Sequence, residues 1–242
     1  MDVYENAMVE ARVAFANRIN KLIKTANAEN LGFFLIYYAA LGAMLHDSME
    51  IVLKKASKRC QKMGLIDLAE AFNAQACLES EQHLKMENDA KAWIDWWNQK
   101  RDLELSAKDY LRHPTTSSMH IYKDLHKNII RYQWPFAELA VSYELQRTQM
   151  IHSFSLIKLA SLKLGLSALK KLGFIRRAAK LNTDQPLNKK VLTEFLQAHP
   201  ETVSVMANKA RAALLVYGDF IEDCFKLADN EAKKYQLLEA VT

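Results

Sequence analysis

The chain has 242 residues, of which 50% are apolar, so it can bury one sizeable hydrophobic core but is short for two ordinary domains. Its six glycines and four prolines are too few for the many tight turns of a β-sandwich or barrel, and its apolar fraction excludes an intrinsically disordered chain. The formal net charge of +5 is modest and gives no indication of nucleic-acid binding. We therefore expect a single folded domain over residues 1–242.

The first half of the chain shows helical periodicity almost throughout. Apolar residues recur at helical spacing over about 3–26, 30–62 and 66–99, and each stretch predicts one helix. The segment Met63-Gly64-Leu65 separates the second helix from the third. A connector over about 100–118 follows, with a short helical turn before Pro114.

The second half continues the same pattern with more interruptions. Helices are predicted over about 119–132, from Pro135 to about Leu164, onward to about Leu181, from Asp184 and Pro186 to Ala198, and from Pro200 to about Leu238. The period-two alternation of β-strands is absent from the sequence. These elements predict an all-α protein, built as a single multi-helix bundle with several helices longer than 25 residues.

Two His/Glu pairs on the second and third helices carry the clearest chemical signal. His46 and Glu50 are four residues apart, as are Glu79 and His83, so each pair shares one face of its helix. If the break at Gly64 forms an antiparallel hairpin, His46 lies level with His83 and Glu50 lies level with Glu79, with the two levels about 6 Å apart.

Carboxylates and imidazoles that project inward from antiparallel helices are the ligands of di-iron and di-manganese sites in helical bundles. The apolar stripes around both pairs favour an inward orientation, and buried charges need partners. The alternative interpretation is two ordinary intrahelical pairs at the edge of the bundle. Tyr37 and Tyr38 precede His46 by about two turns, so that a tyrosine could approach the same site.

A later helix offers a further carboxylate. Glu138 and Glu144 are six residues apart and lie on roughly opposite faces, so we expect only one of them to point inward, and the small residues beside Glu144 favour it. His152 is at most an outer partner. The spacing Glu-x-x-His, which ferritin-type oxidases use twice, does not occur in the sequence. A standard ferritin-like oxidase is therefore disfavoured.

The run Glu81-Gln82-His83-Leu84-Lys85-Met86-Glu87-Asn88-Asp89, followed by Trp96-Trp97-Asn98, resembles a helix of haem-oxygenase-like proteins. The branch that it resembles most is that of the CADD-like proteins, relatives of TenA and PqqC, and the order of long and short helices fits over most of the chain. The superfamily includes haem oxygenases, cofactor-ring oxidases, thiaminases and non-haem di-iron oxidases. The resemblance therefore implies a fold with an internal pocket more firmly than it implies a reaction.

In the di-iron branch, a glutamate and a histidine on one core helix are joined by a glutamate on a later helix and by a His-x3-Asp pair. The resemblance places Glu79 and His83 in the first two roles, and Glu138 or Glu144 in the third. Residues 168–184 contain no histidine, so the His-x3-Asp pair is missing. Either His46 and Glu50 replace it, or one metal ion is bound, or the site has been lost.

Two other activities of the superfamily are disfavoured. Haem degradation needs a proximal histidine on the first helix, and residues 1–30 contain none, so no haem is expected. A TenA-like thiaminase needs a nucleophilic cysteine, and none of Cys60, Cys77 and Cys224 has a recognisable context for that role.

Two functional hypotheses remain from the sequence. The first is a CADD-like oxidoreductase that acts on a small molecule inside the bundle. Its iron or manganese ligands would be Glu79, His83, Glu144, His46 and Glu50. The second is a non-catalytic helical binding protein that uses the bundle pocket or a basic surface. In both cases we expect a homodimer.

A basic segment could form that surface. Between Leu145 and Thr193 ten Lys or Arg residues stand against a single acid, Asp184, and leucines interleave with them. This pattern indicates docking to an acidic protein partner or to an anionic membrane surface. The alternative is a core helix whose lysine heads reach water along the rim of the bundle. The segment lacks the aromatic residues that stack on single-stranded nucleic acid.

Three further features favour a cytoplasmic protein. The three cysteines show no CxxC spacing, and an odd number suits a reducing compartment. The N-terminus has no apolar stretch of the signal-peptide type. The longest apolar run, Leu31 to Leu45, is about 15 residues long, so we expect no integral membrane span.

Overall fold

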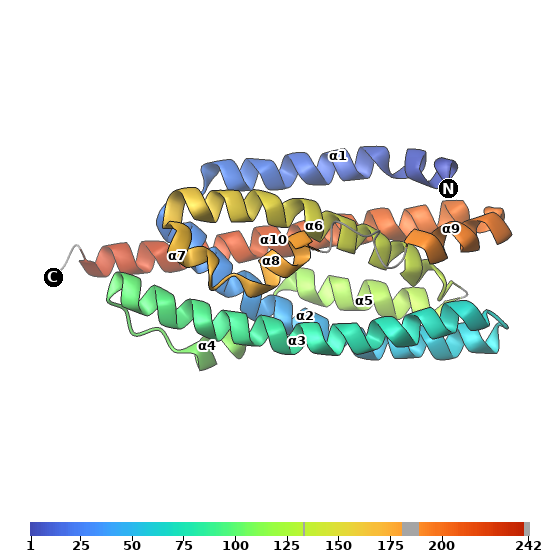
Figure 1. Ribbon diagram of the computed structural model, residues 1–242, viewed down its shortest axis with the longest axis horizontal. Helices are drawn as coiled ribbons and strands as arrows, with labels where there is room; N and C mark the ends of the chain where they lie inside the picture. The colour runs from blue at the N-terminus through green and yellow to red at the C-terminus, as the bar shows by residue number, and fades with distance from the viewer. Residues whose placement is uncertain (133, 181–188, 240–242) are drawn as a thin grey trace.

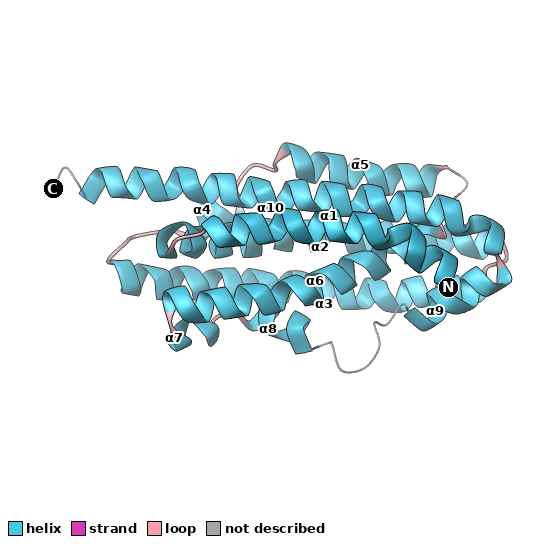
Figure 2. Ribbon diagram, turned by 90° about the horizontal axis from the view of Figure 1, so that it is seen from above, coloured by secondary structure: helices cyan, strands magenta, loops and turns pink. Residues whose placement is uncertain are grey.

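The computed structural model of the protein describes residues 1–132, 134–180 and 189–239, and within them the fold is an all-α bundle (Figure 1). Six of the helices are long and follow the long axis of the molecule, as both ribbon views show (Figure 2). They are α1 (Asp2–Thr25), α2 (Ala28–Lys62), α3 (Ile66–Arg101), α5 (Ser117–Arg131), α6 (Ala137–Leu164) and α10 (Val203–Glu239). Four short helices and one 3₁₀ turn connect them: α4 (Ala107–Leu111), α7 (Leu166–Leu169), α8 (Gly173–Lys180), α9 (Lys189–Ala198) and η1 (Pro200–Thr202).

The predicted all-α fold class is confirmed, and the predicted helices lie close to the observed ones. The second helix begins two residues earlier than expected, because the Asn27 side chain caps it in a reciprocal capping box with Asn30. The segment from Asp184 to Pro186, where a short helix was expected to begin, lies outside the described residues. Its C-terminal end at Ala198 agrees with α9.

The hairpin of α2 and α3 is the most extensive packing contact in the fold. Gly64 makes its turn with φ of +78°, a left-handed conformation that glycine adopts without steric cost. Farther along, Trp97 lies against Gly32, and the Trp93 indole donates a hydrogen bond of 2.9 Å to the Gly32 carbonyl. These contacts fix how the two helices are rotated toward each other.

Helix α2 lies at the centre of the bundle, in contact with α3, α4, α5, α6 and α10. Its length and composition would allow it to cross a membrane, but 78% of its most apolar window is buried inside the protein. That burial is typical of the core helix of a soluble bundle and agrees with the expectation of no integral membrane span.

Candidate functional site

The structure joins His46 of α2 to Glu79 of α3. His46 Nδ1 and Glu79 Oε2 are 2.5 Å apart, and the two side chains are only 14% and 15% exposed. A carboxylate that accepts a hydrogen bond from Nδ1–H fixes the tautomer of the ring and leaves Nε2 as the atom that can accept a proton or bind a ligand. The hairpin therefore brings two of the predicted residues together, as a pair across helices.

His46 also lines a small, partly open cavity of about 30 Å³ between α2, α3, α5, α6 and α10. This volume holds about two water molecules. Its wall is rich in tyrosine, and Tyr38 lines the same cavity as His46, whereas Tyr37 does not. The lining residues are Tyr38, Gly42, Leu45, His46, Met49, Met86, Tyr122, Gln149, Tyr217 and Phe220.

The three tyrosines of this cavity are uncharged, and two of them are joined by a hydrogen bond. The Tyr38 and Tyr217 hydroxyls lie 2.8 Å apart, and the Gln149 amide donates to the Tyr217 hydroxyl at 3.4 Å. Burial raises the pKa of Tyr217 to about 12, and burial together with Tyr217 raises the pKa of Tyr38 well above 10. Burial and the nearby Glu79 carboxylate raise the pKa of Tyr122 in the same way. All three groups are therefore neutral phenols that can donate or accept hydrogen bonds to a bound molecule.

His83 and Glu50 lie close to the pair but do not join it. The His83 ring is held by a contact of 2.9 Å between Nδ1 and the Ala43 carbonyl, and its Nε2 lies 3.9 Å from Glu87. Glu50 pairs with Lys54, and hydrogen bonds from Lys54 and Ser80 lower the pKa of Glu50. Of these four predicted residues, His46 and Glu79 are thus the two that pair with each other, although they were expected to lie one helical turn apart in level.

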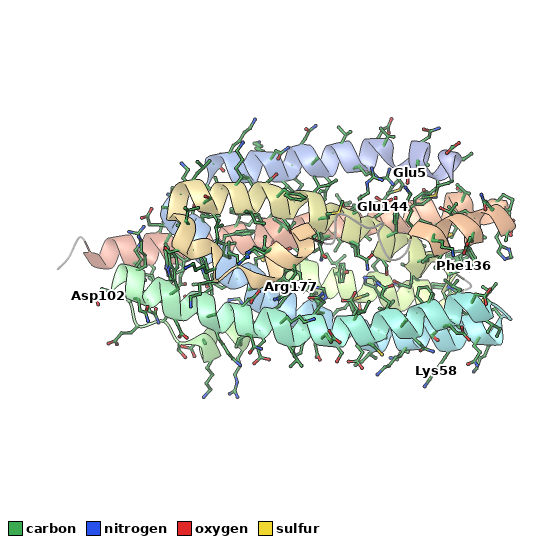
Figure 3. All side chains as sticks on the ribbon, viewed as in Figure 1. Glu5, Lys58, Asp102, Phe136, Glu144 and Arg177 are labelled. Atoms are coloured by element: carbon green, nitrogen blue, oxygen red, sulfur yellow. The ribbon has the colours of Figure 1, made fainter. Side chains whose placement is uncertain are left out.

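Glu144 belongs to a different network, in which α1 is bound to α6. It is fully buried and accepts hydrogen bonds from Arg12 Nε at 2.8 Å, Arg12 Nη2 at 2.5 Å and the Tyr4 hydroxyl at 3.1 Å. Glu5 of α1 also binds Arg12, and Figure 3 shows Glu5 and Glu144 close together between α1 and α6. Glu144 is therefore held by an internal cation in place of the metal that the sequence suggested.

The expectation that only one of Glu138 and Glu144 points inward is wrong, because both side chains are fully buried. Residues 137–145 of α6 are buried on every side, since α6 packs against α1, α2, α5, α8 and α10. Opposite faces of this helix therefore both lie inside the protein.

Sequence reasoning missed the partner of Glu138. His126 Nδ1 on α5 lies 2.7 Å from Glu138 Oε2, and neither side chain has any exposed surface. The ring of Tyr122 meets the His126 ring edge-on at 4.5 Å, so this second His/Glu pair lies directly behind the cavity wall. The available signal was the stripe of Met119, Tyr122 and His126, which places the histidine on the buried face of a helix with a strong apolar side.

The five predicted ligands therefore occupy four separate places: the His46–Glu79 pair, His83 beside the Ala43 carbonyl, Glu50 beside Lys54, and the Arg12 network of Glu144. Within residues 1–132, 134–180 and 189–239, no group of three or more His, Cys, Asp or Glu side chains is arranged to hold a metal ion. The side chains as placed do not fit the predicted iron or manganese centre. The structure does contain two histidines that each contact a carboxylate, His46 with Glu79 and His126 with Glu138.

No protein-family model, no curated protein and no solved structure matches the chain. The all-α architecture is compatible with a helical-bundle superfamily. Function must therefore be inferred from the cavity, its His46–Glu79 pair and the surface of the bundle.

Proposed function

We propose that the protein binds a small polar molecule in the tyrosine-lined cavity, and that His46 acts on this molecule as a general acid or base. The observation that carries this proposal is the 2.5 Å contact between His46 and Glu79 at the wall of the cavity. In such a pair the carboxylate orients the ring and leaves Nε2 as the atom that can take up and return a proton.

The volume of the cavity restricts the molecule to a few non-hydrogen atoms unless the lining side chains move. Met49 and Met86 both line the cavity, and methionine is the most adaptable apolar side chain in protein cores. Their methyl groups are therefore natural reporters of binding.

We would label the methionine methyl groups with carbon-13 and titrate formate, formamide and methanol while recording NMR spectra. We expect saturable shifts of the Met49 and Met86 signals for at least one compound, because both side chains line the cavity. The exposed Met63 serves as an internal control that should not shift. If none of the three compounds shifts Met49 or Met86, the binding proposal is wrong.

The acid–base role has its own test in the nitrogen-15 spectrum of the imidazole rings. A contact between His46 Nδ1 and Glu79 predicts that neutral His46 carries its proton on Nδ1. A Glu79→Gln variant should change this tautomer balance, whereas a variant of the more exposed Glu81 should leave it unchanged. A proton on Nε2 in the unmodified protein would contradict the proposal.

The second candidate is the CADD-like oxidoreductase with iron or manganese, supported by the sequence resemblance and by the contact of one imidazole with one carboxylate. Elemental analysis of protein purified without a histidine tag or chelator distinguishes the two candidates. Near-stoichiometric iron or manganese that is lost in His46→Ala would favour the oxidoreductase. Absence of bound metal after anaerobic incubation with iron(II) would favour the metal-free acid–base site.

A further inference from the structure

A second feature of the molecule is a basic and apolar surface that begins on the exposed face of α6 and continues past α7. Residues 145–180 contain eight Lys or Arg residues and no Asp or Glu. Arg147 and Arg177 are bound to Glu5 and Asp89. The exposed cations of this segment, none with an ion pair in the described part of the chain, are Lys158 and Lys163 of α6, Lys170 and Lys171 directly after α7, and Arg176 of α8.

Large apolar side chains are exposed among these cations. Ile151, Phe154 and Leu162 are 55%, 47% and 73% exposed, and Leu166 is 74% exposed. The first three share one face of α6 with Lys158, because their positions recur at intervals of three and four residues. Leu162 and Leu166 are the most exposed, and they lie on either side of Gly165, where α6 ends and α7 begins.

Gly165 turns the chain with φ of +90°, so the two leucines lie at a corner of the bundle. Figure 2 shows α7 at the lower margin of the molecule, outside the layer of long helices. An outward corner with exposed leucines and flanking lysines suits a deformable, negatively charged surface better than it suits a flat protein face.

We propose that this corner, formed by residues 151–171 from α6 through α7 to the turn that follows it, binds the protein peripherally to an anionic lipid bilayer. The leucines enter the interfacial layer of the bilayer, and the lysines are attracted to the anionic lipid headgroups. The interaction requires no membrane-spanning helix, and it is independent of the chemistry in the cavity.

Sedimentation of the full-length protein with vesicles tests this proposal. We expect binding to phosphatidylcholine vesicles that contain about 30% phosphatidylglycerol, and little binding to pure phosphatidylcholine, because the lysines recognise surface charge. Binding should weaken in ~0.5 M salt, where charges are screened beyond a few ångströms. Equal binding to both kinds of vesicle, or binding to neither, would overturn the proposal.

Two variants assign the binding to this corner. Replacing Lys163, Lys170 and Lys171 by Gln should weaken binding roughly 100-fold, at about fivefold per lysine. The matched control replaces Lys55, Lys58 and Lys62 of α2 by Gln, because these lysines are also exposed. Both variants lose three positive charges, so the control should leave binding nearly unchanged if the position of the lysines decides the effect.

The leucines are tested by Leu162→Ser together with Leu166→Ser, which should weaken binding at least about tenfold because their apolar area no longer leaves water. Ile51→Ser together with Leu215→Ser, at 56% and 63% exposed positions elsewhere, is the matched control. If lipid-free protein is instead a dimer that dissociates in the Leu162/Leu166 variant, a second copy covers this face and the proposal is wrong.

Discussion

The Arg12 guanidinium holds the buried Glu144 carboxylate in a two-point contact, with Nε on one oxygen and Nη2 on the other. This fork geometry is the strongest form of ion pairing between side chains. It joins α1 to α6 across 132 residues of sequence, and the Tyr4 hydroxyl donates a further hydrogen bond to Glu144. Helix α1 is therefore attached to the bundle by a specific polar contact as well as by its apolar face.

Removing this cation should strongly destabilise the fold. Arg12→Ala leaves the fully buried Glu144 without its counter-charge, and we expect the free energy of unfolding to fall by about 3–5 kcal/mol. Arg18→Ala is the control, because its partners Asp219 and Glu222 are 41% and 29% exposed, and it should cost about 1 kcal/mol or less. Urea unfolding followed by circular dichroism measures both. Equal losses for the two variants would show that burial of Glu144 does not govern the effect.

His152 should make the stability of the protein depend on pH. Burial lowers the pKa of His152 from the ordinary 6.5 to about 4, so the folded protein keeps this ring neutral where the unfolded chain already binds a proton. The contribution of the neutral His152 ring to the free energy of unfolding is therefore fully present above pH 6.5, and it is lost as the pH falls from 6.5 toward 4. The loss amounts to about 3 kcal/mol relative to a variant without this histidine.

His152→Leu is that variant, since leucine has a similar size and does not titrate. Unfolding measured at a series of pH values should show two curves that diverge below pH 6.5, with the variant less sensitive to acid. Parallel curves across this range would mean that His152 does not contribute to the acid sensitivity.

The hairpin of α2 and α3 could be predicted because Gly64 interrupts an otherwise continuous helical pattern. The contact between His46 and Glu79 could be predicted only to within one turn. Rotation of each helix about its axis is set by contacts such as Trp97 on Gly32, which the spacing of residues along one helix does not encode. The sequence therefore indicated the pairs His46/Glu50 and Glu79/His83, each within one helix, and not the pair of His46 with Glu79 between the two helices.

The partners of the two buried glutamates illustrate the same limit. Arg12 is 132 residues from Glu144, and no local pattern relates them. His126 is only 12 residues from Glu138, but the chain between them reverses direction, and helical spacing does not describe such a turn. Burial on every side of residues 137–145 of α6 is likewise a property of the helices that surround them.

The His126–Glu138 pair should behave as a coupled unit. His126→Leu or Glu138→Leu alone leaves a fully buried polar partner, and we expect each to cost about 3–5 kcal/mol. The double variant removes both polar groups and should regain at least half of the summed loss, because His126 Nε2 and Glu138 Oε1 have no other partner among the described residues. A double-mutant cycle from urea unfolding measures this coupling. Simple addition of the two single losses would contradict it.

Two glycines of α2 should respond oppositely to alanine, although both lie inside the same helix. A Cβ at Gly32 would lie 2.4 Å from the Trp97 ring, which is itself packed in the core and cannot retreat. A Cβ at Gly42 would meet the Met86 methyl group at the same distance, but a methionine side chain can change its rotamer. Alanine also favours a helix over glycine by roughly 1 kcal/mol. Gly32→Ala should therefore lose about 1–3 kcal/mol of unfolding free energy, whereas Gly42→Ala should be near neutral or stabilising.

The Gly42 variant also reports on the cavity, because Met86 lines it and would be displaced toward the space beside His46. Thermal and urea unfolding compare the two variants, and the methionine methyl spectrum follows Met86 directly. A stable Gly42→Ala protein whose Met86 signal shifts, and which no longer responds to the small polar compounds, would connect the packing of the hairpin to binding in the cavity. A Gly42→Ala protein as unstable as Gly32→Ala would show that Met86 is as rigidly packed as Trp97.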